Sequence, residues 1–138
     1  MAAFNKFNSF VEDLAEKVHN LGADSIKVML TNTAPVAANT VYANLIDLAT
    51  AGGYTAGGNV CAITSSAQTA GTYKLVLVDS VFTATTGFGP FRYAALYNDT
   101  AVSKQLIGWY DYGSAVTLLA LETFTVDFDG AAGVITIV

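Results

Sequence analysis

Short stretches in which polar and apolar residues alternate fill most of the chain from residue 25 to residue 138. Such alternation places the apolar side chains on one face of an extended strand, and many of these side chains are β-branched or aromatic. No helical pattern lies between the stretches, which excludes parallel βαβ winding. The sequence therefore predicts a mainly β fold, a jelly-roll or Greek-key β-sandwich with one N-terminal amphipathic helix.

Turn residues divide this region into its expected strands. The predicted strands cover residues 25–31, 59–66, 72–83, 91–98, 105–112, 114–119, 122–129 and 133–138. A chain of 138 residues is long enough to bury roughly two-thirds of the surface that its unfolded form exposes. We therefore expect a single β-sandwich domain over residues 1–138.

The first 22 residues carry the helical pattern. Large apolar side chains recur at steps of three and four residues, which places them on one stripe of a helix that Gly22 would end. The stripe consists of Phe4, Phe7, Phe10, Leu14, Val18 and Leu21. It is too apolar to remain in water, so this helix is expected to pack on the protein's own sheet, with a neighbouring subunit as the alternative.

Residues 33–58 interrupt the strand pattern. They are rich in Ala, Asn, Thr and Gly, and their only apolar run, at residues 41–48, could form one helical turn or a short strand. Long excursions of this kind are uncommon in compact domains unless they have a role. The segment is therefore predicted to cross the surface and to be a candidate contact region.

Composition limits the partners. Charged residues make up only 12% of the chain and hydrophobic residues 53%, so part of the apolar surface is expected to meet another chain. The net charge is −5 and the six basic residues are scattered, which argues against nucleic acid as a partner. No apolar run approaches the ~20 residues of a membrane helix, and acids near the N-terminus argue against a signal peptide. The protein is expected to be made in a reducing cytoplasm, without membrane contact.

The residues that could carry chemistry are few. His19 is expected to be a partly exposed helix residue, and Cys61 a small buried hydrophobe that can form no disulfide within the chain. The glycine-rich residues 52–58 lack the ending of a phosphate-binding loop and predict a flexible turn. Val126 and Phe128 are expected to form the inward face of their strand, which leaves Asp127 and Asp129 pointing outward before a hairpin glycine; the full calcium-loop spacing is missing. We expect no catalytic, cofactor-binding or metal-binding residue, and no enzyme activity.

Aromatic side chains are the remaining candidates for a binding surface. Trp109 and Tyr112 belong to a strand with aromatic residues on both faces. One face is expected to pack in the core, and the other to contact a neighbouring subunit or to bind a sugar. The candidate protein-interface residues are Phe4, Phe7, Phe10, Tyr42, Tyr54, Trp109 and Tyr112.

Five segments extend over nearly the whole chain and resemble a known group of proteins. They are FNKFNSFVEDLA at residues 4–15, KVMLTNTAP at 27–35, GYTAGG at 53–58, FRYAALYNDT at 91–100 and TFTVDFD at 123–129. Together they resemble small virion proteins of tailed bacteriophages, closest to the capsid cement (decoration) proteins of Bordetella phages. The resemblance implies a jelly-roll that binds the outside of the head and staples the major capsid protein. It supplies no catalytic residues.

The resemblance and the composition lead to one expected function and one alternative. A cement protein would act as a homo-oligomer, dimer or trimer, on the outer surface of the capsid in the virion, because packaged DNA repels a protein with net charge −5. The alternative is a tail or fibre-associated module that binds a host glycan or another tail protein. Such a module would present an exposed aromatic platform at Trp109 or Tyr112.

Overall fold

The longest strands of the protein form the centre of an antiparallel sheet. The computed structural model describes residues 2–138, in which β7 (Gly87–Asn98) and β8 (Leu106–Leu119) pair as a hairpin. β2 (Ile26–Thr31) pairs with the other side of β7. Two short strands, β1 (Phe4–Lys6) and β3 (Asn59–Cys61), complete a five-stranded sheet in the order β1-β8-β7-β2-β3.

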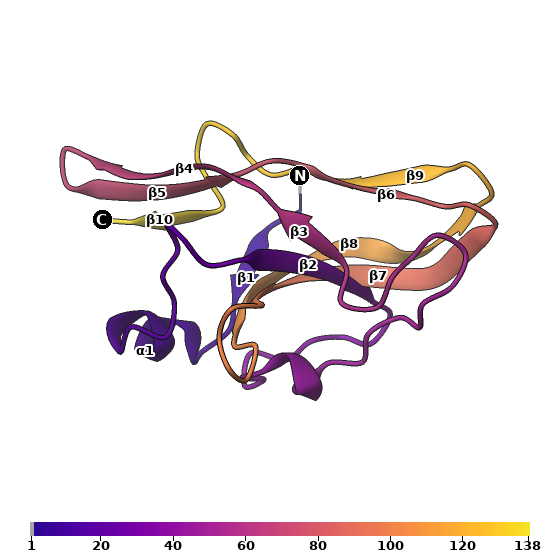
Figure 1. Cartoon of the computed structure of the whole chain (residues 1–138), viewed down its shortest axis with the longest axis horizontal. Helices are drawn as coiled ribbons and strands as arrows, with labels where there is room; N and C mark the ends of the chain where they lie inside the picture. Colours follow the sequence, from indigo (N-terminus) through magenta and orange to yellow (C-terminus); the bar gives the residue numbers. More distant parts are fainter. Residues whose placement is uncertain (1) are drawn as a thin grey trace.

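Five shorter strands form a second layer on one side of this sheet (Figure 1). One end of the layer holds β4 (Ile63–Thr69), β5 (Thr72–Leu77) and β10 (Ile135–Ile137), and the other end holds the pair β6 (Ser80–Thr83) and β9 (Thr123–Val126). The chain crosses between the layers after β3, β6 and β8. This confirms the predicted class, a mainly β antiparallel sandwich.

The main core lies between the two layers. Alternation in β2 sends Ile26, Val28 and Leu30 inward, where each is at most 1% exposed. Leu75 of β5 and Phe82 of β6 meet them from the second layer. Because each large side chain that is fully buried contributes about 1.5–3 kcal/mol, this interlayer core is the main source of stability.

A second, smaller core covers the opposite face of the five-stranded sheet. Met29, Ala95, Tyr97 and Leu106 point to this face and are fully buried there. The excursion between β2 and β3 packs over them and contributes Tyr42 and Leu45. Of the two alternatives for its apolar run, a helical turn or a short strand, the structure has a short 3-10 helix, η1 (Tyr42–Asn44), preceded by an isolated β-bridge from Val41 to Gln105. The excursion therefore covers an apolar sheet face that would otherwise meet water.

The predicted N-terminal helix over residues 1–22 is wrong. Residues 4–6 instead form β1, and the helix α1 (Phe10–Ala15) has only six residues. The reason is that the apolar side chains of the stripe enter different cores: Phe7 joins the smaller core, whereas Phe10 and Leu21 join the interlayer core. A single straight helix could not reach both faces of the sheet. The packing is within the chain, as the first alternative proposed.

Several strand boundaries also differ from the prediction: β7 begins at Gly87 and not at residue 91, β9 ends at Val126 and not at residue 129, and the predicted strands are divided or joined differently at three places. Residues 59–66 are divided between β3 and β4, because the chain passes from one layer to the other at Ala62. Residues 72–83 are divided between β5 and β6 for a similar reason, since the two strands lie at opposite ends of the second layer. Residues 105–112 and 114–119 are joined in one strand, β8, whose register against β7 shifts between them.

His19 is buried, which corrects the prediction of a partly exposed helix residue. It lies beyond the end of α1 and is 4% exposed, with its ring against Phe10. Its Nδ1 atom lies 3.1 Å from the Nδ2 atom of Asn98. Burial lowers the pKa of the imidazole, and the nearby carboxylates of Asp13 and Asp24 only partly oppose this effect.

This burial predicts a pH dependence of stability. The unfolded state takes up a proton near the ordinary pKa of 6.5, whereas the folded state resists protonation until a lower pH. The free energy of unfolding should therefore fall as the pH drops below about 7, with a slope of at most about 1.4 kcal/mol per pH unit for one proton. Urea denaturation curves recorded from about pH 7.5 to about pH 5, at intervals of roughly half a pH unit, give the free energy of unfolding at each pH.

A His19→Gln variant provides the control. Its free energy of unfolding should be lower at neutral pH but nearly flat over this range, because the titrating group is gone. Three carboxylates have lowered pKa values in the folded protein, so their contribution to stability is lost only at more acidic pH. They are Asp99, Asp111 and Asp129. Parallel curves for the two proteins between pH 7 and pH 5 would show that His19 does not control this transition.

Candidate functional site

The second layer carries almost no charge. Its five strands contain a single charged residue, Lys74, which is exposed on β5, and the other outward side chains of β4 and β5 are uncharged. We call this surface the uncharged face; it consists of Ser65, Ala67, Thr69, Thr72, Lys74 and Val76, which line a shallow hollow. The centres of protein interfaces are depleted of charged residues. The uncharged face shares this low charge, although serine and alanine are not residue types that interfaces favour.

The edges of this layer are unprotected. β4 and β10 are the outer strands of the three-stranded sheet, and β6 and β9 each have one edge that no other strand pairs with. Free edges usually carry lysine, proline or other charges that prevent contact with another chain. None of these four strands contains a charged residue or a proline. The edges thus add unpaired backbone groups to the uncharged face.

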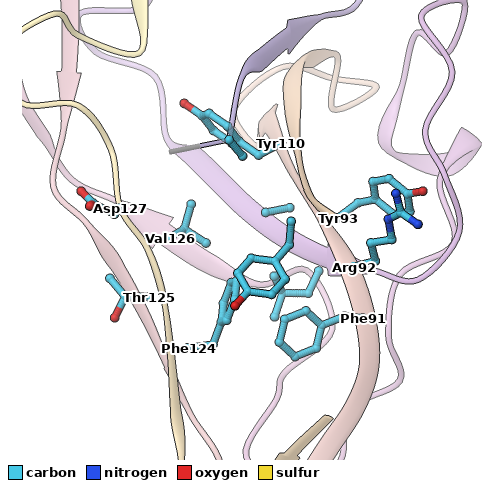
Figure 2. Close-up of a pocket in the computed structure, with 12 residues that line it drawn as sticks. Phe91, Arg92, Tyr93, Tyr110, Phe124, Thr125, Val126 and Asp127 are labelled. Atoms are coloured by element: carbon cyan, nitrogen blue, oxygen red, sulfur yellow. The ribbon is translucent and has the colours of Figure 1, made fainter. Parts of the chain in front are cut away.

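An aromatic groove opens between the layers, beside β9. We define it by Phe91, Tyr110, Tyr112, Phe124 and Val126, which line a cavity of about 360 Å³. Figure 2 shows Phe91 and Tyr110 on one side of this space and Phe124 and Val126 on the other. The Phe124 ring packs edge-on against Phe91 at 4.9 Å and against Tyr112 at 5.5 Å between ring centroids. Tyr112 is 58% exposed and forms the rim of the groove.

A bulge in β8 places Tyr112 at this rim. Asp111 pairs with Tyr93, but the next paired residue of β8 is Val116, opposite Phe91, so the residues between them project from the sheet. Arg92 fixes the base of the bulge through two hydrogen bonds to Asp111, of 2.7 and 2.9 Å. These hydrogen bonds lower the pKa of the Asp111 carboxyl. The two charged groups neutralise one another, and their side chains remain 39% and 37% exposed.

Asp47 is a polar centre that the sequence analysis missed. Its carboxylate accepts hydrogen bonds from the Tyr42 hydroxyl at 2.6 Å, from the Tyr54 hydroxyl and from the Gly57 amide. The Tyr54 hydroxyl in turn accepts the Leu30 amide of β2 at 3.1 Å. Burial and these contacts with Asp47 raise the pKa of Tyr42 and of Tyr54. We call this network the Asp47 clamp, because it fastens the excursion to the sheet.

The seven predicted interface residues do not form one surface. Phe7, Phe10 and Tyr54 are 0%, 4% and 2% exposed, so their prediction as interface residues is wrong: the protein's own cores cover them. Phe4 is partly buried against Tyr110.

Tyr42 and Trp109 are also partly buried, and they belong to the smaller core on the opposite face of the five-stranded sheet. Tyr112 is the exposed one of the seven. The local sequence around each aromatic residue does not show whether the second layer or the excursion will cover its side chain.

The other candidate residues have structural surroundings. Cys61 is 3% exposed, as predicted, and burial raises the pKa of its thiol to about 12. Val126 and Phe128 point inward and Asp127 is exposed, as the alternation indicated. Asp129 accepts hydrogen bonds from the Ala131 and Ala132 amides, which fixes a turn before β10.

Two searches of the described residues gave no further site. Within residues 2–138, no group of three or more His, Cys, Asp or Glu side chains lies close enough together to hold a metal ion. In the same range, none of the helices has the length and apolar character needed to span a bilayer. Comparisons with protein-family models, with curated proteins and with solved structures gave no match for this chain.

Proposed function

We propose that this chain is a capsid cement protein of a tailed bacteriophage. In this proposal it binds the outside of the head as a homo-oligomer and joins neighbouring subunits of the major capsid protein. The observation that carries the proposal is the uncharged face, with a single charged residue in the five strands of its layer. The resemblance of five sequence segments to small virion proteins provides the identity of the partner.

The composition of the uncharged face fits this role. Cement proteins must hold several capsid subunits against the pressure of packaged DNA, so the contact has to be broad and stable. A surface of small, uncharged side chains can approach another protein closely without leaving a charge buried and unpaired. The chain's net charge of −5 favours the outer surface, because the DNA inside the head repels it.

The location of the protein in purified particles tests the proposal. Heads and tails are separated, and the protein is detected in each fraction with an antibody. We expect it on heads, accessible to protease in intact particles and retained in moderate salt, because a contact with few charges is weakly screened. Detection on tails only would support the tail-module alternative, and protection from protease in intact heads would contradict an outer location.

A charge placed in the uncharged face should abolish binding. Ser65 is exposed on β4 opposite Val76, so Ser65→Glu adds a carboxylate that has no cation directly across the strand pair and should fold normally. In the complex the added carboxylate would lose its water, which costs several kcal/mol, so binding to heads should weaken by at least about a hundredfold.

Ala43→Glu is the matched control. Ala43 is exposed in η1, over the opposite face of the five-stranded sheet, so the same charge there should leave binding unchanged. Urea denaturation of both variants confirms that they are folded. Equal binding by the two variants would mean that the uncharged face is not the contact surface.

A further inference from the structure

We propose that the aromatic groove receives an extended, uncharged segment of the major capsid protein, which adds as a strand beside β9 and inserts an apolar side chain between Tyr110 and Phe124. This inference rests on the proposed function and specifies one of its contacts. It uses the groove between the layers, which is distinct from the uncharged face on the outside of the second layer.

Unpaired strand edges on both sides of the groove favour an extended occupant. β9 pairs with β6 on one side and with no other described strand. On the other layer, β1 pairs with β8 only as far as Tyr110, and the following residues of β8 pair with no other described strand on that side, where Ala2 of the N-terminal segment lines the groove. Backbone N–H and C=O groups at a free edge are a template for a further strand. A segment in the groove could therefore form main-chain hydrogen bonds as well as side-chain contacts.

The shape and lining of the groove fit an apolar side chain. Its volume of about 360 Å³ is at the lower end of the range for ligand pockets and exceeds what one large side chain needs. Phe124 and Val126 point into it from β9, whereas Thr125 and Asp127 lie on the far side of that strand (Figure 2). This alternation is the one that a neighbouring strand would match, with its apolar side chains inward and its polar side chains outward.

The backbone edge of β9 favours a peptide over a sugar. The lining also contains the hydroxyls of Tyr93, Tyr110 and Tyr112, which polar groups of either ligand could reach. An extended peptide can in addition form a row of main-chain hydrogen bonds along the unpaired edge of β9, which a sugar cannot do.

The absence of charge along these edges indicates that the segment is itself uncharged. β9 contains no charged residue, and neither does β8 from Tyr112 to its end at Leu119. Of the charged residues in the lining, Arg92 is paired with Asp111 and Asp127 lies on the far side of β9, so a charged side chain inserted between the rings would lose its hydration without a partner beside it.

Photo-crosslinking from the rim of the groove tests the inference. Tyr112 is replaced by p-benzoylphenylalanine, the protein is bound to heads that lack it, and the crosslinked peptides are identified by mass spectrometry after irradiation. We expect crosslinks to one uncharged segment of the major capsid protein. The same replacement at Tyr42, over the opposite sheet face, is the control and should give no crosslink to that segment. Crosslinks from Tyr112 to a second copy of this chain, or to no protein, would overturn the inference.

A variant that fills the groove from within the chain gives an independent readout. Ala2 is exposed and lines the groove, so Ala2→Trp should occupy it without disturbing a core position. We expect binding to heads to weaken at least tenfold. Ala3→Trp, also exposed but outside the groove lining, is the matched control and should bind normally.

The outcomes separate this inference from the proposed function. If the unmodified protein does not bind heads, the proposed function itself fails. If it binds and Ala2→Trp binds equally well, the groove is not a contact and only the inference fails. Release of the bound protein from heads by glucose or N-acetylglucosamine would likewise contradict a peptide occupant.

Discussion

Replacing Gly58 by alanine is expected to prevent folding, or to lower the free energy of unfolding by more than about 3 kcal/mol. Gly58 has a φ of +72°, which L-residues adopt only with strain. A Cβ atom at this position would also lie 1.9 Å from the carbonyl oxygen of Val28. Val28 belongs to β2, which β7 and β3 hold on both sides, so its backbone cannot move away.

Gly71→Ala is the matched control for this prediction. Gly71 has a similar φ of +83°, but an added Cβ would meet nothing within 4 Å. Its cost should be limited to backbone strain, about 1–2 kcal/mol. Soluble yield and urea denaturation measure both variants. If Gly58→Ala were no less stable than Gly71→Ala, the close approach of the excursion to β2 would be incorrect.

The glycine-rich residues 52–58 differ in one respect from the prediction made from the sequence. Residues 52–58 were predicted to be a flexible turn, and the turn is present, but its backbone packs directly on neighbouring strands. A Cβ atom on Gly52 would lie 1.8 Å from the carbonyl oxygen of Gly87 in β7. Glycine is needed here for close packing as well as for its φ angle.

Replacing Asp47 by alanine should lower the free energy of unfolding by about 2–4 kcal/mol. The Asp47 clamp supplies one acceptor for three donors, the hydroxyls of Tyr42 and Tyr54 and the Gly57 amide. Removal of the carboxylate leaves the Tyr54 hydroxyl buried without this acceptor, and a buried polar group that loses its partner is costly. Urea denaturation at neutral pH gives the difference from the unmodified protein.

Tyr42→Phe is the control for the clamp. It removes one of the three donors and leaves the acceptor in place, so its cost should stay near 1 kcal/mol. If Asp47→Ala were as stable as Tyr42→Phe, the apolar contacts of the smaller core would hold the excursion without help from the carboxylate. Asp47 lies in the excursion and is not part of the uncharged face, so a variant that remains folded should still bind heads.

Local sequence was sufficient to predict the sandwich class and much of its strand content. The alternation of Ile26, Val28 and Leu30 specifies which face of β2 is buried, because successive side chains of a strand point in opposite directions. The burial of Cys61 and the inward positions of Val126 and Phe128 follow from the same rule. Each of these predictions depends on near neighbours in the chain.

Local sequence was misleading wherever two different structures satisfy the same pattern. Steps of three and four residues near the N-terminus fit one long helix, but they also fit a short strand and a short helix whose side chains enter two cores. Tyr54 has the same local appearance as an exposed aromatic residue, yet β2 supplies the partner that buries it, 24 residues away in sequence.

The tertiary structure decided everything that depends on distant segments meeting. Asp47 gains its three donors only when the excursion folds over the sheet, and the aromatic groove exists only because β9 lies across from β7 and β8. The sequence by itself determined that the chain forms strands and which side chains of a strand share a face, because these follow from backbone geometry over a few residues. Long-range packing determines which sheet faces and strand edges remain exposed. The candidate binding surfaces of this protein consist of these exposed faces and edges.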